Sequence, residues 1–356
     1  MSPLPWLQDR SGTAALLGGG AAAVLLAWGC LGAARAPLAG WLVGLVFWLG
    51  IALGALSLLA VQAMTGGRWG ATLNPALGPA AAGLPLFLPL VLPLLAGLAV
   101  LYPWASDPAV LPAADVARFY LNVPGFVART LLAILGWSVF AWLLLRPGER
   151  PRPLAGALGL AFHLVAVTLI SVDWMLSLEP SFSSTAFGVA TLLMQFVAAL
   201  AWAATLRPEG QGEAPGRAGD LATLLYAAAL GSLYLGFAQF LVSWYGNLPD
   251  KAAWFLKREA PEWIWLQAIA LGLAAALPLG ALLLARVRRS PAALARLGPW
   301  ILLGILAHQA WIVAPAVGLA ALPAALLGVL AVGGLWVAGA YGPIGARLMR
   351  REVPHG

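Results

Sequence analysis

The sequence predicts an all-α polytopic membrane protein with about ten transmembrane helices. The chain is 62% hydrophobic and has a mean hydropathy of +0.90. Apolar runs of about 18 or more residues recur along nearly its whole length, and each can cross a hydrocarbon core about 30 Å thick. The sequence lacks the alternating pattern that predicts strands, and an open sheet cannot satisfy its backbone in lipid.

Ten spans follow one another along the chain. They cover residues 13–34, 38–64, 80–101, 124–145, 154–173, 183–205, 221–245, 263–285, 296–316 and 319–342. Residues 1–36 also resemble a signal peptide, because an apolar core follows Arg10 and ends near Ala34-Arg35-Ala36. The long run and its weakly charged start favour a retained first helix, but a cleaved signal remains the alternative.

The segments between the spans are of two kinds. Three are short, polar and rich in glycine and proline, as linkers are: residues 146–153, 207–220 and 286–298. Two are long and mix aromatic with charged residues, which is typical of functional or docking surfaces: residues 102–124 and 244–265. The turn sequences Asn122-Val-Pro124 and Asn247-Leu-Pro249 lie within these longer segments, since proline disfavours helix in the residue before it.

The basic residues predict the orientation of the spans. If the N-terminus is cytoplasmic, fourteen lysines and arginines fall on that side: Arg10, Arg68, Arg146, Arg150, Arg152, Arg207, Arg217, Arg286, Arg288, Arg289, Arg296, Arg347, Arg350 and Arg351. Five fall on the other side: Arg35, Arg118, Lys251, Lys257 and Arg258. This positive-inside bias predicts that both termini are cytoplasmic.

Several function classes find no support in the sequence. The single cysteine, Cys30, excludes a disulfide framework and a cysteine-ligated iron–sulfur cluster within this chain. No C-x-x-C-H, phosphate loop, Ser–His–Asp set or metal-ligand cluster occurs, so neither a catalytic residue nor a metal site is predicted. The formal charge of +7 is spread over loops, where it suits topology and lipid contacts, and no nucleic-acid partner is expected.

The segment from Ser171 to Val189 carries two carboxylates at a membrane edge. Charged groups there are costly and usually mark a function or a partner contact. Asp173 is either a proton-handling or quinol-facing group or a helix-terminal residue bonded to loop amides. Glu179 is either functional or a favourable charge at the start of the next helix.

Three further residues are candidates for a proton relay. Arg129 lies about one turn inside the outer edge of the fourth span, and Asp173 is its expected partner if spans four and five pack antiparallel. His163 lies about 15 Å deeper than Asp173 and is either a satisfied core residue or a relay. A weaker alternative is that His163 and His308 ligate a b-type haem from two helices.

A second set of candidates faces a quinone headgroup or a partner protein near the outer edge. The set is Tyr102, Trp104, Trp174, Trp244, Tyr245, Asn247 and Trp254. Of these, Trp244, Tyr245 and Trp254 are equally typical of anchors at the membrane interface. Five glutamines are predicted to bond between helices instead: Gln62, Gln195, Gln239, Gln267 and Gln309.

Several stretches together resemble one family. They are Thr65-Gly-Gly-Arg-Trp-Gly70, Leu101-Tyr-Pro-Trp-Ala105, Tyr120-Leu-Asn-Val-Pro124 with Arg129, Ser171-Val-Asp-Trp-Met-Leu-Ser-Leu-Glu-Pro180 with Phe187-Gly188, and Trp244-Tyr-Gly-Asn-Leu-Pro249 with Trp254. In order and spacing, the chain resembles the NrfD-like membrane subunits of the polysulfide-reductase type. More narrowly, it is similar to the second such subunit (ActF-like) of bacterial alternative complex III.

The resemblance implies two four-helix bundles with a flanking helix at each end. The expected parts are a first helix (1–36), the two bundles (37–175 and 176–317), and a last helix with a basic cytoplasmic tail (318–356). It implies a non-redox subunit of a quinol:cytochrome c, or other acceptor, oxidoreductase complex in the bacterial cytoplasmic (inner) membrane. The subunit would support quinol oxidation by its partners and take part in proton translocation.

The same resemblance sets expectations for cofactors and partners. This chain itself would bind no haem or cluster, and quinone binding is left open. Haem c and iron–sulfur clusters are expected in periplasmic partner subunits. A paralogous NrfD-like membrane subunit, membrane lipids and quinol complete the expected partners.

The chain departs from the family at four titratable positions. Gln62-Ala63 stands where a histidine pair is common, and Gly78 or a neighbour replaces a glutamate. Ser181-Phe182 stands in place of His-Trp, and His308 stands where an acidic residue is common. These losses weaken a proton-channel role and favour a scaffold role.

Two alternatives come from other function classes. One is a purely structural anchor for periplasmic electron-transfer subunits. The other is a ten-helix secondary transporter, which broken helices at the membrane centre would support. The glycine and proline interruptions are expected mostly at helix ends, which counts against a transporter.

Overall fold

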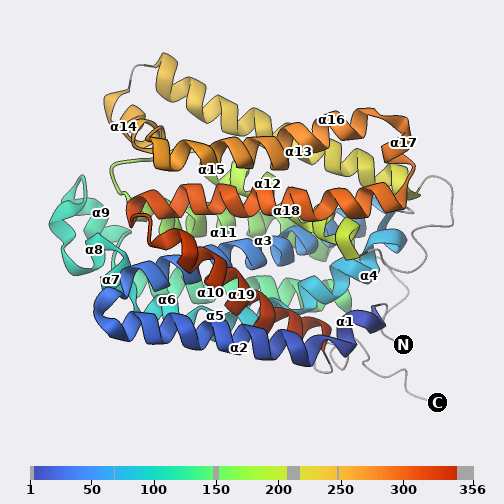
Figure 1. Ribbon diagram of the computed structural model, residues 1–356, viewed down its shortest axis with the longest axis horizontal. Helices are drawn as coiled ribbons and strands as arrows, with labels where there is room; N and C mark the ends of the chain where they lie inside the picture. Colours follow the sequence, from blue (N-terminus) through green and yellow to red (C-terminus); the bar gives the residue numbers. More distant parts are fainter. Residues whose placement is uncertain (1–3, 68, 147–151, 207–216, 247, 343–356) are drawn as a thin grey trace.

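The computed structural model describes residues 4–67, 69–146, 152–206, 217–246 and 248–342. Over these ranges the chain forms helices and turns without any strand, which confirms the all-α class. Ten segments are long and apolar enough to cross a membrane, so the chain is a multi-pass membrane protein. Figure 1 shows the long helices side by side, with the short helices α8, α9 and α14 at one end, here called the α9–α14 end.

The spans lie close to their predicted positions. They are Ser11–Gly32, Arg35–Thr65, Leu73–Ala96, Val123–Leu145, Pro153–Leu178, Phe187–Leu206, Ala218–Tyr245, Pro261–Leu283, Pro291–Ala316 and Ala321–Tyr341. Nine have both ends within about five residues of the prediction. The third begins at Leu73 instead of residue 80, because its prolines do not stop the helix at that end.

Eight spans are built around one long helix each. These helices are α2 (Ser11–Trp28), α3 (Arg35–Thr65), α10 (Val123–Leu145), α11 (Pro153–Trp174), α12 (Phe187–Leu206), α13 (Arg217–Tyr245), α18 (Pro291–Val313) and α19 (Ala321–Tyr341). The eighth span consists of α15 (Pro261–Leu271), the π-helical turn η5 (Gly272–Ala276) and α16 (Leu277–Leu283). Short helices lie at the ends of the molecule: α1 (Pro5–Asp9), α8 (Pro103–Ser106), α9 (Ala114–Phe119), α14 (Pro249–Arg258) and α17 (Ala285–Arg288).

The third span is divided into short pieces. They are α4 (Trp69–Ala82), η2 (Leu84–Leu86), α5 (Phe87–Leu90) and α6 (Leu92–Ala96), followed by α7 (Leu98–Leu101). Proline removes a backbone donor and breaks the helix, and five prolines lie in this stretch: Pro75, Pro79, Pro85, Pro89 and Pro93. The expectation that interruptions lie at helix ends is therefore wrong for this span. Leu84, Phe87 and Val91 are completely buried, so protein surrounds the irregular backbone, as the membrane requires.

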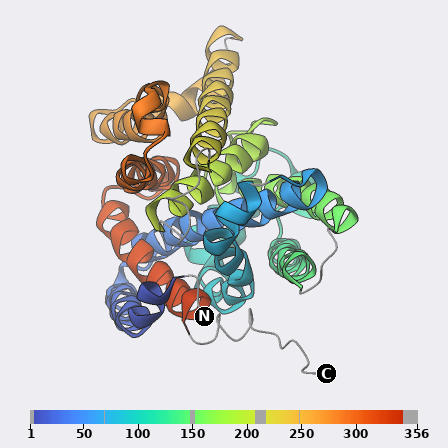
Figure 2. The same ribbon diagram turned by 90° about the vertical axis from the view of Figure 1, so that its right-hand side faces the viewer.

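Helix α3 lies at the centre of the fold. One group of helices consists of α3, α4, α10 and α11, and α3 contacts each of the other three. A second group consists of α12, α13, α15 with η5 and α16, and α18, and α12 contacts α3 across the two groups. Helices α2 and α19 pack on each other at the edge, and α19 also packs on α3. Figure 2 shows α13 (yellow) standing out on the side away from α2 and α19.

Glycines allow α3 to approach its neighbours at backbone distance. A Cβ atom on Gly328 of α19 would collide with the carbonyl oxygen of Gly40 on α3, and one on Gly44 would collide with Gly328. On the other side, a Cβ on Gly54 would collide with the carbonyl oxygen of Gln195 on α12. Small residues four positions apart permit such close helix contacts within a membrane. The two groups and the edge helices are thus held together by contacts that only glycine allows.

Replacing Gly328 with leucine is expected to lower the stability by roughly 1–3 kcal/mol, because the side chain cannot fit against Gly40. Thermal unfolding of the purified protein in detergent measures the change. The matched control is Gly280→Leu on α16, where an added Cβ meets open space, and its unfolding midpoint should stay near that of the wild type. Equal midpoints for both variants would refute this account of the α3–α19 contact.

Candidate functional site

The first ion pair joins α10 to the last turn of α11. Asp173 is completely buried and accepts two hydrogen bonds from Arg129, one from Nε at 2.7 Å and one from Nη2 at 3.1 Å. The Arg129 Nη2 also donates to the carbonyl oxygen of Tyr120 at 2.9 Å, and the guanidinium lies 4.1 Å from the centre of the Tyr120 ring. The predicted pairing of Arg129 with Asp173 is confirmed, and the alternative of Asp173 bonded to loop amides is not what the structure contains.

Aromatic side chains pack around the Arg129–Asp173 pair. The Tyr102 hydroxyl donates to the carbonyl oxygen of Trp174 at 2.9 Å, and Trp174 Nε1 donates to the Thr130 hydroxyl at 3.1 Å. The rings of Tyr102, Trp104 and Phe126 pack with their centres 5.3 to 5.9 Å apart. Burial raises the pKa of Tyr102 well above its usual range, and the nearby Asp173 adds to the shift, so the phenol remains a donor. Tyr102, Trp104 and Trp174 therefore lie inside this chain, where they support the ion pair.

The second ion pair joins the segment after α11 to α14. Glu179 follows the 3₁₀ turn η4 (Leu176–Leu178). Its Oε2 accepts a hydrogen bond from Arg258 Nη2 at 2.5 Å, and its Oε1 accepts one from Lys257 Nζ at 2.7 Å. Arg258 is only 2% exposed and donates further hydrogen bonds to three carbonyl oxygens, those of Trp254, Trp311 and Ile312. One guanidinium thus ties α14 to Glu179 and to the end of α18.

Aromatic rings enclose Arg258 as well. Its guanidinium lies 3.6 Å from the centre of the Trp254 ring, and Phe182 stacks on Trp254 with 4.4 Å between ring centres. Burial lowers the pKa of Arg258 to about 10, and the charge of Glu179 opposes this shift. The guanidinium is therefore charged at neutral pH and depends on the carboxylate for compensation.

Two interpretations of this region need correction. Helix α12 begins at Phe187, so Glu179 does not lie at a helix N-terminus but faces Arg258. Trp254 is 7% exposed and is therefore no interface anchor. Arg258 was absent from the predicted site residues. Its position four residues after Trp254, which brings the two side chains to the same helix face, was the signal in the sequence.

The remaining candidates at this end differ in exposure. Trp244 and Tyr245 close α13 and are 64% and 88% exposed, which suits a contact with lipid or a partner. Asn247 lies outside the residues that the structure describes.

The two histidines belong to different helix groups. His163 Nε2 and Gln195 Oε1 are 3.0 Å apart, which joins α11 to α12 through a buried hydrogen bond. His308 packs near Trp311, with 6.0 Å between ring centres, and lines a cavity to which His163 does not contribute. The structure therefore does not bring these histidines together as a pair of haem ligands. Within the described ranges, no group of three or more His, Cys, Asp or Glu residues could hold a metal.

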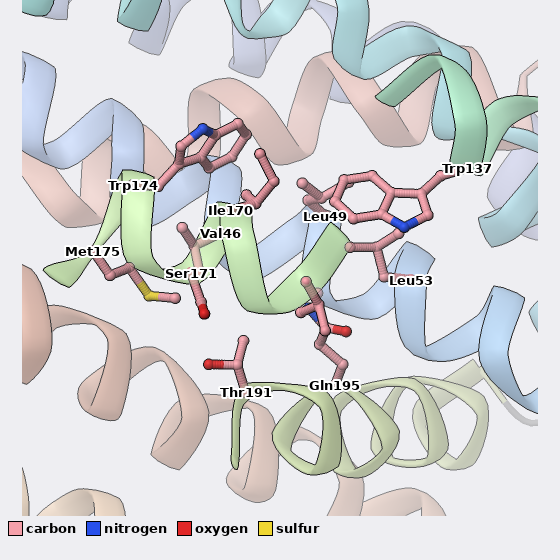
Figure 3. A pocket seen from close by; sticks show the side chains of 12 residues that line it. Val46, Leu49, Leu53, Trp137, Ile170, Ser171, Trp174, Met175, Thr191 and Gln195 are labelled. Atoms are coloured by element: carbon pink, nitrogen blue, oxygen red, sulfur yellow. The ribbon is translucent and has the colours of Figure 1, made fainter. Parts of the chain in front are cut away.

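A small cavity lies between α3, α10, α11 and α12. Its volume of about 20 Å³ has room for about one water molecule. Figure 3 shows the hydroxyl groups of Ser171 and Thr191 in the space between α11 and α12, with Gln195 beside them. Trp137 also lines this cavity, and its buried Nε1 has no partner among the described residues. A water molecule here would lie between the His163–Gln195 pair and the last turns of α11.

A second cavity lies within the other helix group and has a volume of about 390 Å³. It is bordered by α12, α13, α15, η5 and α18, and Phe182, Trp254 and Phe255 close it toward the α9–α14 end. Its lining is mainly apolar and aromatic. The Trp254 ring therefore lies between the Arg258 guanidinium and this cavity.

Comparison with known proteins does not place the chain in a family. No model of a known protein family matches the chain, and no curated protein is significantly similar to it.

Replacing Asp173 with leucine is expected to destabilise the protein by up to about 3–5 kcal/mol, because it leaves the largely buried Arg129 guanidinium, whose side chain is 18% exposed, without its carboxylate. Replacing both Arg129 and Asp173 with leucine should recover most of this loss, since neither charge is then buried. Unfolding of both single variants and the double variant in detergent gives the coupling energy. Strictly additive effects would contradict a direct pair.

Replacing Glu179 with glutamine is expected to loosen α14, because Arg258 loses the carboxylate that compensates its charge. Limited trypsin digestion should cleave after Lys257 and Arg258 about tenfold faster, since cleavage follows the free energy of local opening. The control is Glu262→Gln, an exposed carboxylate that does not adjoin either cleavage site, and its replacement should leave the rate unchanged. Equal rates for the two variants would show that Glu179 does not hold α14.

Proposed function

We propose that this chain is an integral membrane subunit of a respiratory quinol-oxidising complex, similar to the NrfD-like subunits of alternative complex III. The convergence of the resembling stretches carries this proposal. Segments 101–105, 120–129 and 171–180 are far apart in sequence but meet at the α9–α14 end, through the bonds of Tyr102 and Arg129 described above. Trp254 joins them through Arg258, which lies over its ring and bonds Glu179. Of the stretch 65–70, Thr65 to Gly67 lie at the opposite end of α3.

Within such a complex, the α9–α14 end would dock partner subunits. Both carboxylates there are held by guanidinium groups, and a group that relays protons would have to exchange these partners. The geometry thus supports a scaffold role for Asp173, Glu179 and Arg129 better than a relay. His163, with Gln195 and the adjacent small cavity, is the better-placed candidate for proton movement.

The expected partners fit this end of the molecule. Phe119, Trp244 and Tyr245 expose large aromatic surfaces there, with 71%, 64% and 88% of each residue accessible. Aromatic residues are enriched in protein interfaces. We propose that periplasmic iron–sulfur and haem c subunits and a paralogous membrane subunit cover this region, and that these partners carry the redox cofactors.

The orientation in a bacterial cytoplasmic membrane is part of the same proposal. Arg286 and Arg288 lie on α17, at the end opposite to α14 (Figure 1). Helix α1 contacts α19, so the first and last described helices meet at that same end. Both features support cytoplasmic termini.

One observation favours a second candidate, a secondary transporter. Broken helices commonly form transporter binding sites, and the third span is broken. However, no residue of the third span lines either described cavity, and Leu84, Phe87 and Val91 at its breaks are buried against protein. The transporter therefore has weaker support than the respiratory subunit.

Gentle purification of the tagged chain in mild detergent from its native cells is expected to recover haem c and iron–sulfur subunits. Absorbance of reduced haem and electron paramagnetic resonance of the clusters measure them. Trp244→Ala with Tyr245→Ala should reduce recovery severalfold, whereas Leu16→Ala with Leu17→Ala, exposed on α2, should not. Recovery of the wild-type chain alone would refute both the respiratory and the anchor roles.

The conservative variant Asp173→Asn distinguishes a proton role from a scaffold role in the intact complex. A scaffold predicts that quinol-driven turnover and proton release per electron both stay close to the wild type, provided that the complex assembles. A selective loss of proton release with normal assembly would instead assign proton handling to Asp173.

A further inference from the structure

The cavity within the second helix group has a wall that is mainly apolar and aromatic. Its volume is about 390 Å³. Five aromatic residues from four helices line it: Phe187 on α12, Phe237 and Phe240 on α13, Phe255 on α14 and Trp311 on α18. His308 lies in the same wall, stacked on Trp311 with 6.0 Å between the ring centres. Apolar cavities stay dry and take up apolar guests.

The polar groups around the cavity give water little to bind. Thr191 donates to a carbonyl oxygen of its own helix at 2.9 Å, and Gln239 accepts from the Ser184 hydroxyl at 2.9 Å. Gln267 and Gln309 carry Oε1 atoms without a described partner, but protein atoms cover these oxygens, so they do not face the open volume. The surface that an occupant would touch is therefore mostly hydrocarbon.

Helix contacts close the cavity at its inner end, near the middle of the eighth span. Ala274 and Ala275 of the π-helical turn η5 line this end. The turn is held against α18, since a Cβ atom on Gly304 would lie 2.5 Å from the backbone nitrogen of Ala274. Helix α13 contacts η5 and α16 here as well. An occupant therefore cannot pass through the bundle along its axis.

The cavity opens sideways between α13 and α15. Phe237, Phe240 and Leu271 line it and yet are 56%, 36% and 47% exposed, so they form its lip. In Figure 1, α13 and α15 diverge toward the α9–α14 end. Because both helices belong to membrane spans, the lip faces lipid.

The lip lies at the depth of lipid acyl chains. Helix α13 ends at Tyr245 and α15 carries Glu262 in its first turn, so the membrane edge lies near these two residues. At about 1.5 Å per residue, Phe240 lies about 8 Å and Leu271 about 14 Å inside this edge. One leaflet supplies about 15 Å of hydrocarbon, half of the membrane core. A phospholipid with its headgroup at the edge therefore presents an acyl chain to the opening.

We propose that this cavity holds one acyl chain of a membrane phospholipid, which enters between α13 and α15 while the headgroup stays at the membrane edge. Acyl chains are the most abundant apolar groups at the depth of the lip. A chain in the cavity supplies the van der Waals contacts that the lining otherwise lacks. Such a lipid is a structural part of the second helix group, whatever the partners of the protein are.

The test places the purified full chain in nanodiscs that contain a phospholipid with a photoactivatable diazirine on one acyl chain. Mass spectrometry maps the adducts. Surrounding lipid labels exposed residues of the spans in any case. A chain inside the cavity should also label Ile312, which lines the cavity and is only 4% exposed. The matched control is Ile301, which is on the same helix, completely buried and away from the cavity, and it should remain unlabelled.

Two variants test the cavity by shape. Gly236 lines the cavity and an added Cβ meets open space, so Gly236→Leu should narrow the site and lower the labelling of Ile312 severalfold. Gly280→Leu, also in open space but away from the cavity, should be labelled like the wild type. Labelling of Tyr234, which is 67% exposed on α13, provides the internal reference for both variants. Unchanged unfolding midpoints confirm that both variants fold.

Native mass spectrometry of the detergent-extracted chain identifies the occupant. We expect one retained phospholipid in the wild type and in Gly280→Leu, and severalfold less in Gly236→Leu. A chain without retained lipid, or with a quinone or detergent molecule in its place, would overturn the proposal. Equal labelling of Ile301 and Ile312, or unchanged labelling in Gly236→Leu, would do the same. Neither measurement requires partner subunits, so a chain that recovers no haem c subunit still tests this site.

Discussion

The cost of burying charge at the edge of a membrane is the constraint on which this structure depends. Asp173 is completely buried, and such a carboxylate persists only with a partner that is close and well aligned. Arg129 supplies that partner from α10, so the pair sets how α10 meets α11. Tyr102 and Trp174 then pack around it, which positions the segments between the third and fourth spans. One electrostatic requirement thus organises residues from four parts of the chain.

The same requirement recurs in the second helix group with a different outcome. Arg258 is buried by α14 and compensated by Glu179, but its other donors bond backbone carbonyls at the end of α18. These bonds hold α14 against the end of α18, across one end of the second helix group. Next to α14, helices α13 and α15 diverge (Figure 1). The cavity described in the first group has room for about one water molecule, whereas the one described in the second has a volume of about 390 Å³.

Much of the fold could be predicted because an apolar chain in lipid must pair its own backbone groups, which restricts each span to a helix. Span number and helix type follow from hydropathy, and the Arg129–Asp173 pair follows from two rare charges near the ends of consecutive spans. The broken third span was missed, since its prolines are tolerated only where protein surrounds the backbone. Arg258 was missed because a loop arginine is usually exposed, and only tertiary contacts bury it. Cavities depend on the angle between helices, which hydropathy does not specify.

The contrast between the two groups bears on how such a protein divides its tasks. Close glycine contacts join α3 to α12 and α19, and others join α18 to α12 and to η5. Buried polar atoms without a described partner occur in both groups, Trp137 Nε1 in the first and Gln309 Oε1 in the second. The groups therefore differ in the volume that they enclose, about 20 Å³ against about 390 Å³, and not in how completely their polar atoms are paired. Because that volume follows from the angle at which helices cross, the same requirement for a compensated charge at the α9–α14 end is met above a filled bundle and above a hollow one.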